Sequence, residues 1–138
     1  MRGIWRGPSG ESHVTFVAVV DDDEHLRAAV ADLIASYGIE ARGFGTSREY
    51  LDSACVANTS CLITDVQMAG MSGLELHKAL LRRGCHIPVI FVTAFYDERL
   101  RREAESLGAI GFFRKPFDIG MLIVCINSAL AQRQAAAD

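Results

Sequence analysis

Short apolar runs alternate with longer segments of helical periodicity along most of the chain. The first run, residues 14–20, ends abruptly at three consecutive aspartates. Runs of this length without regular polar alternation are typical of strands that are covered on both faces. Residues 26–37 then place apolar side chains at i, i+3 and i+4 spacing, which predicts an amphipathic helix ending at Gly38.

The same alternation recurs to the end of the chain. We expect the remaining strands at residues 39–42, 61–64, 89–92 and 109–113. We expect the remaining helices at residues 48–56, 73–83 and 97–107, and a last helix that Asp118 caps and that runs to about residue 131. Strands and helices that alternate with short connections predict an α/β fold, with one mostly parallel sheet, helices on both faces and right-handed crossovers.

Length and composition are those of one folded domain. The chain has 138 residues, of which 50% are hydrophobic and 22% are charged, enough to bury a core. The net charge of −3 argues against direct nucleic-acid binding, because no basic excess is available to neutralise phosphates.

Two terminal segments bear on domain boundaries and location. Residues 1–13 lack the apolar core of a signal peptide, so we expect a flexible extension before a domain at 14–131 and a short tail at 132–138. The apolar stretch 121–126 is far shorter than the about 20 residues that span a bilayer. The four cysteines have no zinc-site spacing, so we expect reduced, mostly buried thiols in a cytoplasmic protein without membrane contact.

Polar residues follow four of the predicted strands at the point where each one ends. They are Asp21, Asp22, Asp65, Thr93 and Lys115. Ligands bind to open parallel sheets beyond the carboxyl ends of the strands. Three carboxylates, a hydroxyl and an ammonium group are therefore expected to converge on one edge of the sheet.

Such a cluster suits phosphoryl transfer. Three neighbouring carboxylates repel one another, and Lys115 offsets only one charge, so a hard divalent cation is expected. Oxygen-only ligands favour magnesium, calcium or manganese, and magnesium characteristically works beside phosphate. Asp65 could then attack phosphorus and form an aspartyl-phosphate, with Thr93 donating a hydrogen bond to a phosphoryl oxygen.

With these residues in place, the sequence resembles a response-regulator receiver domain, the module that accepts a phosphoryl group from a histidine kinase. The resemblance covers about residues 14–131 and rests on five stretches in order, VVDDDE at 19–24, LITD at 62–65, MSGLEL at 71–76, VIFVTA at 89–94 and 108–117 with its KPF ending. It implies a flavodoxin-like (βα)5 fold with strand order 2-1-3-4-5.

The resemblance also assigns a metal site. It implies that Asp65 is the phosphoacceptor and binds Mg²⁺ together with Asp22. Asp21 is expected to act on the ion through water, and the backbone carbonyl of Gln67 to complete the protein ligands.

The remaining implied roles concern the phosphoryl group and the response to it. Lys115 matches the phosphate-binding lysine, whose bond to Pro116 is expected to be cis. Thr93 matches the switch hydroxyl, and Phe112 matches the aromatic residue that turns inward when that threonine moves.

Three positions near the site bear on how closely this chain follows the family. Ala69 stands where the family usually has proline, which leaves the loop less rigid but removes no reacting group. Gln67 and Phe95 stand two residues after Asp65 and Thr93, at positions that influence how water reaches the phosphoryl group. We hypothesise that Phe95 shields the phosphoryl group and slows autodephosphorylation.

The leading functional hypothesis is a phosphorelay receiver that switches protein contacts and is no enzyme beyond self-phosphorylation and slow autodephosphorylation. Expected partners are a histidine kinase or phosphotransfer protein, a downstream output protein, and a second copy bound through the fourth helix, fifth strand and fifth helix. The first alternative is the amino-terminal receiver of a DNA-binding transcriptional regulator.

Two further alternatives come from other functional classes. A magnesium-dependent phosphohydrolase would need an acid two residues after Asp65, where this chain has Gln67. A flavin or nucleotide binder would need a glycine-rich loop after the first strand, where the chain has aspartates that repel phosphate.

Overall fold

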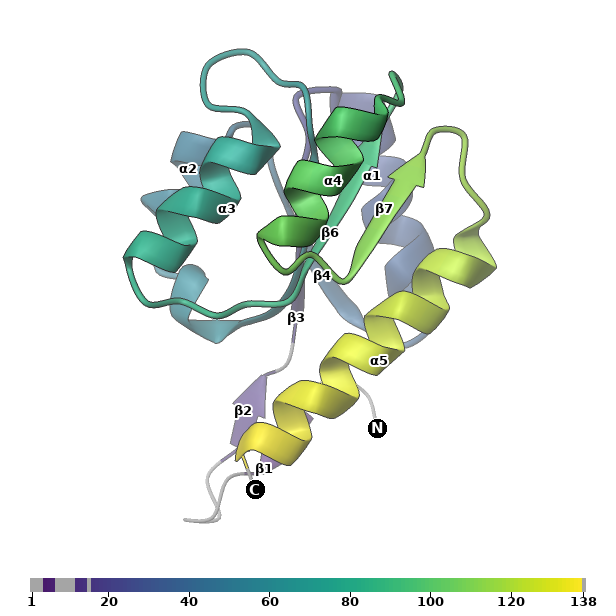
Figure 1. Cartoon of the computed structure of the whole chain (residues 1–138). Coiled ribbons are helices and arrows are strands. Elements are labelled where there is room, and N and C mark those ends of the chain that lie inside the picture. Colours follow the sequence, from purple (N-terminus) through teal and green to yellow (C-terminus); the bar gives the residue numbers. More distant parts are fainter. Residues whose placement is uncertain (1–3, 7–11, 15, 138) are drawn as a thin grey trace.

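A five-stranded parallel sheet forms the centre of the protein. The computed structural model describes residues 4–6, 12–14 and 16–137 (Figure 1). The strands lie in the order β4-β3-β5-β6-β7, which confirms the expected order 2-1-3-4-5. Their bounds are β3 Phe16–Val20, β4 Glu40–Phe44, β5 Thr59–Asp65, β6 Val89–Thr93 and β7 Gly111–Arg114.

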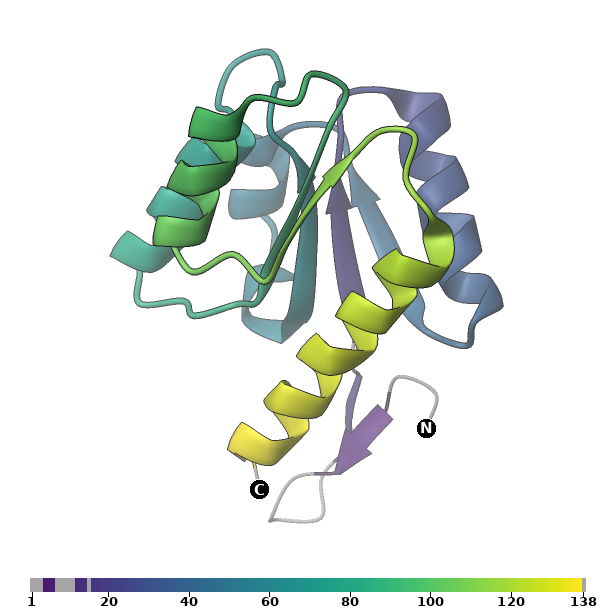
Figure 2. The same cartoon turned by 45° about the vertical axis from the view of Figure 1, so that its right-hand side comes forward.

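Helices cover both faces of this sheet, as the alternating pattern predicts. They are α1 Glu24–Ser36, α2 Ser47–Leu51, α3 Gly73–Arg82, α4 Glu98–Ser106 and α5 Ile119–Ala137. Figures 1 and 2 show α1 and α5 on one face and α2, α3 and α4 on the other. The doubly wound α/β architecture is therefore confirmed.

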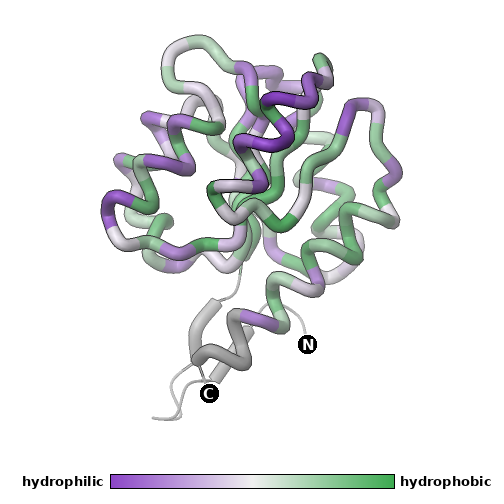
Figure 3. Tube along the Cα trace, in the orientation of Figure 1, coloured by the Kyte–Doolittle hydropathy of each residue, from purple (hydrophilic) through white to green (hydrophobic). Residues whose placement is uncertain are grey.

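The core has two halves, one on each face of the sheet. Successive strand residues point to opposite faces, so Phe16, Ala18 and Val20 join one buried cluster and Val17 and Val19 join the other. All five residues of β3 are buried, which explains why this segment lacks polar alternation. In Figure 3 the hydrophobic colour follows the inner strands, and the hydrophilic colour lies mainly on the outer turns of the helices.

Side-chain caps place the helix starts close behind the strand ends. The Asp23 carboxylate caps α1 by accepting a hydrogen bond from the Leu26 amide at 3.1 Å. Ser72 and Glu75 form a reciprocal capping box at the start of α3. The predicted cap Asp118 is confirmed, since its Oδ1 accepts hydrogen bonds from the amides of Gly120 and Met121. These caps satisfy backbone amides that the first turn of each helix leaves without a partner.

Two predicted boundaries near the amino terminus differ from the structure. The strand predicted at 14–20 begins at Phe16, and β1 (Ile4–Arg6) instead pairs antiparallel with β2 (Ser12–Val14). Flexibility of residues 1–13 stays a prediction. The helix predicted at 48–56 is wrong in length, because α2 ends at Leu51 and Val56–Asn58 form a separate 3₁₀ turn. Local hydrogen bonds from Ser53 and Thr59 hydroxyls to backbone carbonyls compete with further helix there.

The last helix is longer than predicted. It runs to Ala137, whereas the periodic pattern suggested an end near residue 131 and a tail after it. Residues 132–137 are glutamine, arginine and alanine, which are good helix formers without a stop signal. In the part of the chain that the structure describes, no helix has the length and hydrophobicity needed to cross a bilayer.

One histidine is buried inside this fold. His77 lies on α3 with 3% of its surface exposed, and its ring centroid is 5.8 Å from that of Phe91. Among the described residues, its Nδ1 atom has no hydrogen-bond partner. Burial lowers the pKa of His77 below its usual value of 6.5, because the charged form loses its hydration.

Replacing this histidine should change how stability depends on pH. The unfolded chain takes up a proton near pH 6.5, whereas folded His77 does so only at lower pH, so acidification favours unfolding. We therefore expect His77→Leu to become progressively more stable relative to the parent as the pH falls below 6.5, with a constant difference above it. Denaturant unfolding between pH 5 and pH 8 measures this, with the exposed His86→Gln as control. A difference that does not vary with pH would contradict the expectation.

Candidate functional site

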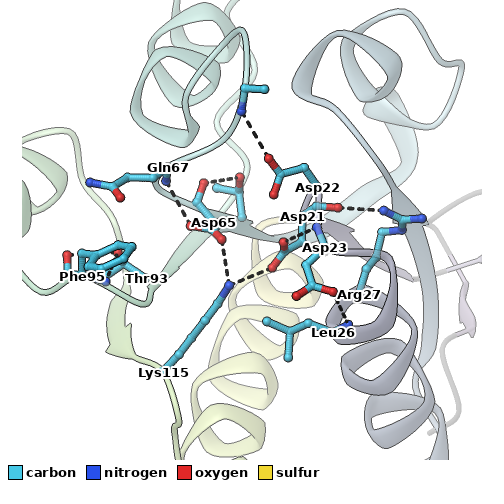
Figure 4. Close-up of polar contacts among 12 residues, drawn as sticks. Asp21, Asp22, Asp23, Leu26, Arg27, Asp65, Gln67, Thr93, Phe95 and Lys115 are labelled. Atoms are coloured by element: carbon cyan, nitrogen blue, oxygen red, sulfur yellow. Dashed lines mark hydrogen bonds and ion pairs between the residues drawn. The ribbon is translucent and has the colours of Figure 1, made fainter.

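The carboxyl ends of the strands bring most of the predicted site residues together (Figure 4). Asp21 follows β3 and Asp65 ends β5, and these neighbouring strands pair Val20 with Thr64. The register therefore sets Asp21 beside Asp65, as the parallel-sheet rule predicts. At the other side of the site, Lys115 directly follows β7 and its backbone amide donates to the Thr93 carbonyl at 2.7 Å.

A lysine bridges two of the three aspartates. Lys115 Nζ lies 2.7 Å from Asp65 Oδ2 and 3.0 Å from Asp21 Oδ2. The three side chains are at most 15% exposed, so water screens these ion pairs only weakly. Burial lowers the pKa of Lys115, but the hydrogen bonds to Asp65 and Asp21 outweigh it and leave the pKa raised. The lysine therefore stays charged in the site.

The surroundings of Asp65 disfavour its ionised form. Burial raises the pKa of this carboxyl above its usual range, and the hydrogen bonds from Lys115 and from the Gln67 amide offset only part of the effect. The nearby Asp21 carboxylate raises the pKa further. The surroundings of Asp65 therefore disfavour its ionised form relative to an exposed aspartate, and a nearby cation would offset this effect.

The three carboxylates fit a hard metal ion. One oxygen from each of Asp21, Asp22 and Asp65 lies within 4.8 Å of the other two. With a single ammonium group bonded to them, the cluster keeps an excess of negative charge. Oxygen ligands without nearby sulfur or imidazole are the set that magnesium, calcium and manganese prefer. Asp22 is exposed, so the cluster is open to solvent on that side.

Backbone contacts hold the loop that carries Asp21. The Asp21 amide donates to the Phe44 carbonyl at 3.1 Å, and Arg27 Nη1 donates to the Asp21 carbonyl at 2.8 Å. The Arg27 stem crosses Gly43 on the neighbouring strand, where a Cβ atom would lie 3.0 Å from Arg27 Cγ. Sequence reasoning missed Arg27, because only the fold brings it onto Gly43 and back to Asp21.

Gly73 closes the loop that follows Asp65. A Cβ atom at this position would lie only 2.2 Å from the Asp65 carbonyl oxygen, so only glycine fits. Its amide also donates to the Val66 carbonyl at 2.9 Å. The glycine stands within a stretch that carries the resemblance, but its contact with Asp65 could not be read from the sequence.

The loop between β5 and α3 also touches two carboxylates through its backbone. The Gln67 amide donates to Asp65 Oδ1 at 3.0 Å, and the Ala69 amide donates to Asp22 Oδ2 at 3.2 Å. The Gln67 carbonyl remains a predicted metal ligand. The Ala69 contact was also missed, since nothing in the sequence relates residue 69 to residue 22.

Thr93 ends β6 at the same edge of the sheet, but its hydroxyl bonds its own loop. The Oγ1 atom accepts from the Phe95 amide and donates to the Phe95 carbonyl, both at 3.1 Å. Thr93 is fully buried, whereas the Phe95 ring is 70% exposed. In Figure 4 Phe95 lies beside Thr93, across the site from Asp22.

Phe112 lies on β7, the strand next to β6, and is half-buried. Its ring packs edge-on against Tyr96 at 5.9 Å and lies 6.4 Å from Phe91. It also borders a cavity of about 250 Å³ between α4 and β7. The other lining residues are Arg101, Ala104, Glu105, Ala109, Ile110 and Gly111. The ring therefore has neighbouring space on the side of α4. The Lys115–Pro116 peptide bond is cis, as expected.

Comparison with known proteins gives a consistent result. Residues 17–127 match the family described as the response regulator receiver domain. The chain is 40% identical over 116 residues to Nodulation protein W of Bradyrhizobium diazoefficiens, an alignment covering 82% of this chain and 51% of that protein. It is 39% identical over 116 residues to the Transcriptional regulatory protein FixJ of Azorhizobium caulinodans, covering 84% of this chain and 55% of that protein. The chain thus spans about half the length of these curated relatives.

Solved structures show the same fold. The crystal structure of FixJ-N superposes with a TM-score of 0.76 at 32% identity, covering 85% of this chain and 93% of that one. A receiver domain protein from Clostridium thermocellum superposes with a TM-score of 0.81 at 25% identity, covering 89% and 99% of the two chains.

Removing the bridging ammonium should destabilise the protein. Lys115→Met keeps most of the aliphatic stem but leaves the buried Asp21 and Asp65 carboxylates uncompensated. We expect the free energy of unfolding to fall by about 1–3 kcal/mol in metal-free buffer, and an added divalent cation to restore part of the loss.

Lys78→Met is the matched control, because Lys78 forms an exposed ion pair with Glu103 at 2.8 Å. An exposed pair of this kind adds little stability, so this variant should unfold almost like the parent. Urea titration of the three proteins measures the effect. Equal losses for both lysine variants would show that the bridge has no special role.

Proposed function

The chain belongs to the response regulator receiver domain family, and we propose that it accepts a phosphoryl group on Asp65 in a magnesium-dependent reaction. The observation that carries the proposal is the cluster in which Lys115 bridges Asp65 and Asp21 beside Asp22. The expected donor is a phosphohistidine on a histidine kinase or phosphotransfer protein.

In the transfer, an oxygen of the Asp65 carboxylate attacks phosphorus, and the bond between phosphorus and the donor imidazole nitrogen breaks. The imidazole leaves with the bonding electron pair. Lys115 offsets the negative charge brought by the phosphoryl group, and the Thr93 hydroxyl donates to one of its oxygens. Burial raises the pKa of Asp65, and positive charge beside the attacking carboxylate would oppose this shift.

The residues present fit magnesium at this place. Asp22, Asp65 and the Gln67 carbonyl would hold the ion directly and Asp21 would hold it through water, in line with its preference for oxygen ligands and retained water. Bound there, the ion would neutralise charge on the phosphoryl oxygens.

The response to phosphorylation would pass through Thr93 and Phe112. The Thr93 hydroxyl now bonds the backbone of Phe95, and it cannot keep both of these bonds while donating to a phosphoryl group. Movement of this loop would change the packing of Tyr96 on Phe112, beside the cavity that Phe112 borders. The altered surface would be the face made by α4, β7 and α5, through which an output protein or a second copy of the chain would bind.

The wider setting of this switch is also proposed. Residues 14–131 would form the receiver, with an extension at 1–13 before it and a tail at 132–138 after it, most of which is the last part of α5. One similar protein is named a transcriptional regulatory protein and another a nodulation protein. The second candidate is therefore a receiver within a DNA-binding regulator. The acidic receiver itself would not contact DNA. All four cysteines are free, which is consistent with the reducing cytoplasm where histidine kinases phosphorylate their partners.

Catalytic turnover is not expected from this site. A phosphohydrolase with an aspartyl-phosphate intermediate would use an acid two residues after the nucleophile, and Gln67 cannot serve as one. We therefore propose self-phosphorylation and slow autodephosphorylation only.

Phosphorylation can be tested with a small acyl phosphate as donor. We expect intact mass spectrometry to show one magnesium-dependent phosphoryl adduct on the parent and none on Asp65→Asn. Asp97→Asn is the control, because Asp97 caps α4 and should leave the adduct unchanged. A persistent adduct on Asp65→Asn, or rapid multiple-turnover hydrolysis of phosphate esters, would count against the proposal.

The lifetime of the phosphorylated form tests the role of Phe95. Its exposed ring would limit the access of water to the phosphoryl group, so Phe95→Glu should lose phosphate severalfold faster than the parent. Phe95→Leu keeps an apolar side chain and should remain close to the parent. Loss of phosphate can be followed by intact mass after removal of the donor. Equal rates for all three proteins would refute shielding by this residue.

A further inference from the structure

We propose that the backbone amide of Ala69 is a positioning group for the metal site, because it ties together the two loops that carry metal ligands. This inference rests on the proposed function. One loop follows β3 and carries Asp21 and Asp22, and the other follows β5 and carries Gln67. The Ala69 amide donates to Asp22 Oδ2 at 3.2 Å and so joins residues that are 47 positions apart in the chain (Figure 4).

The Asp22 side chain depends on this contact more than its neighbours depend on theirs. The Asp21 carboxylate accepts from the Asp23 amide and from Lys115, and the Asp65 carboxylate accepts from the Gln67 amide and from Lys115. Asp22 is exposed, and within the described part of the chain its side chain accepts a hydrogen bond from the Ala69 amide alone.

An exposed carboxylate that rotates freely must lose that freedom when it binds an ion. A hydrogen bond formed beforehand removes part of this loss, so the site is preorganised. The carboxylate has two oxygens with several lone pairs, and accepting one N–H group leaves acceptor capacity for a cation. Residue 69 can contribute in this way only if it has an amide hydrogen, which alanine has and proline lacks.

The test compares Ala69→Pro, which removes the donor, with Ala69→Ser, which keeps it. Isothermal titration of the whole chain with Mg²⁺ gives the dissociation constant of each. We expect Ala69→Pro to weaken magnesium binding about two- to fivefold, the effect of one exposed hydrogen bond to a charged group, and Ala69→Ser to match the parent.

A mutant cycle separates this contact from a general effect on the loop. In an Asp22→Ala background, Ala69→Pro should weaken magnesium binding clearly less than it does in the parent, because the acceptor oxygen is gone. A purely structural effect of proline would weaken binding equally in both backgrounds and would overturn the proposal. Unchanged or tighter magnesium binding by Ala69→Pro would also overturn it.

Amide hydrogen exchange detects the hydrogen bond without any metal. In the metal-free protein, the Ala69 amide should exchange faster in Asp22→Ala than in the parent, whereas the Gln67 amide should be unchanged because its acceptor is Asp65. Equal exchange of the Ala69 amide in both proteins would refute the contact even if Ala69→Pro failed to fold.

If the parent binds no magnesium, the proposed function and this inference both fail. If the parent binds it and Ala69→Pro does so equally well, only the inference fails.

Discussion

Repulsion among the carboxylates at one edge of the sheet is the constraint on which the rest of the site depends. Asp21 and Asp65 are buried side by side because β3 and β5 are neighbouring parallel strands in fixed register. Lys115 reduces this repulsion by donating hydrogen bonds to both carboxylates. It reaches them because β7 pairs with β6 and ends beside Thr93. The negative charge that remains would favour a bound cation at this place.

The strands and the loops contribute in different ways to the position of the carboxylates. The central strands are covered on both faces and tightly packed, so they fix where each loop begins. The loops that follow are held by contacts such as the hydrogen bond from the Arg27 side chain to the Asp21 carbonyl and the one from the Ala69 amide to Asp22. These contacts join the carboxylate-bearing loops to other segments of the chain.

The two sides of the site differ in how their residues are bonded. Towards β3, the Asp21 segment is bonded to Phe44 and Arg27. Towards β7, the Thr93 hydroxyl bonds the backbone of Phe95 in its own loop, Phe95 is exposed, and Phe112 is half-buried beside a cavity. This difference supports the proposal that a change at Asp65 is transmitted towards α4 and β7.

The sequence by itself determined the alternation of strands and helices and the residues at the strand ends, because burial on both faces leaves continuous apolar runs and parallel strands share one carboxyl edge. The resemblance supplied the strand order. Only the tertiary structure decided where α2 ends, that Gly73 lies against Asp65, and that Ala69 bonds Asp22. These features depend on contacts between segments far apart in the chain or on competing local hydrogen bonds, and neither leaves a periodic trace in the sequence.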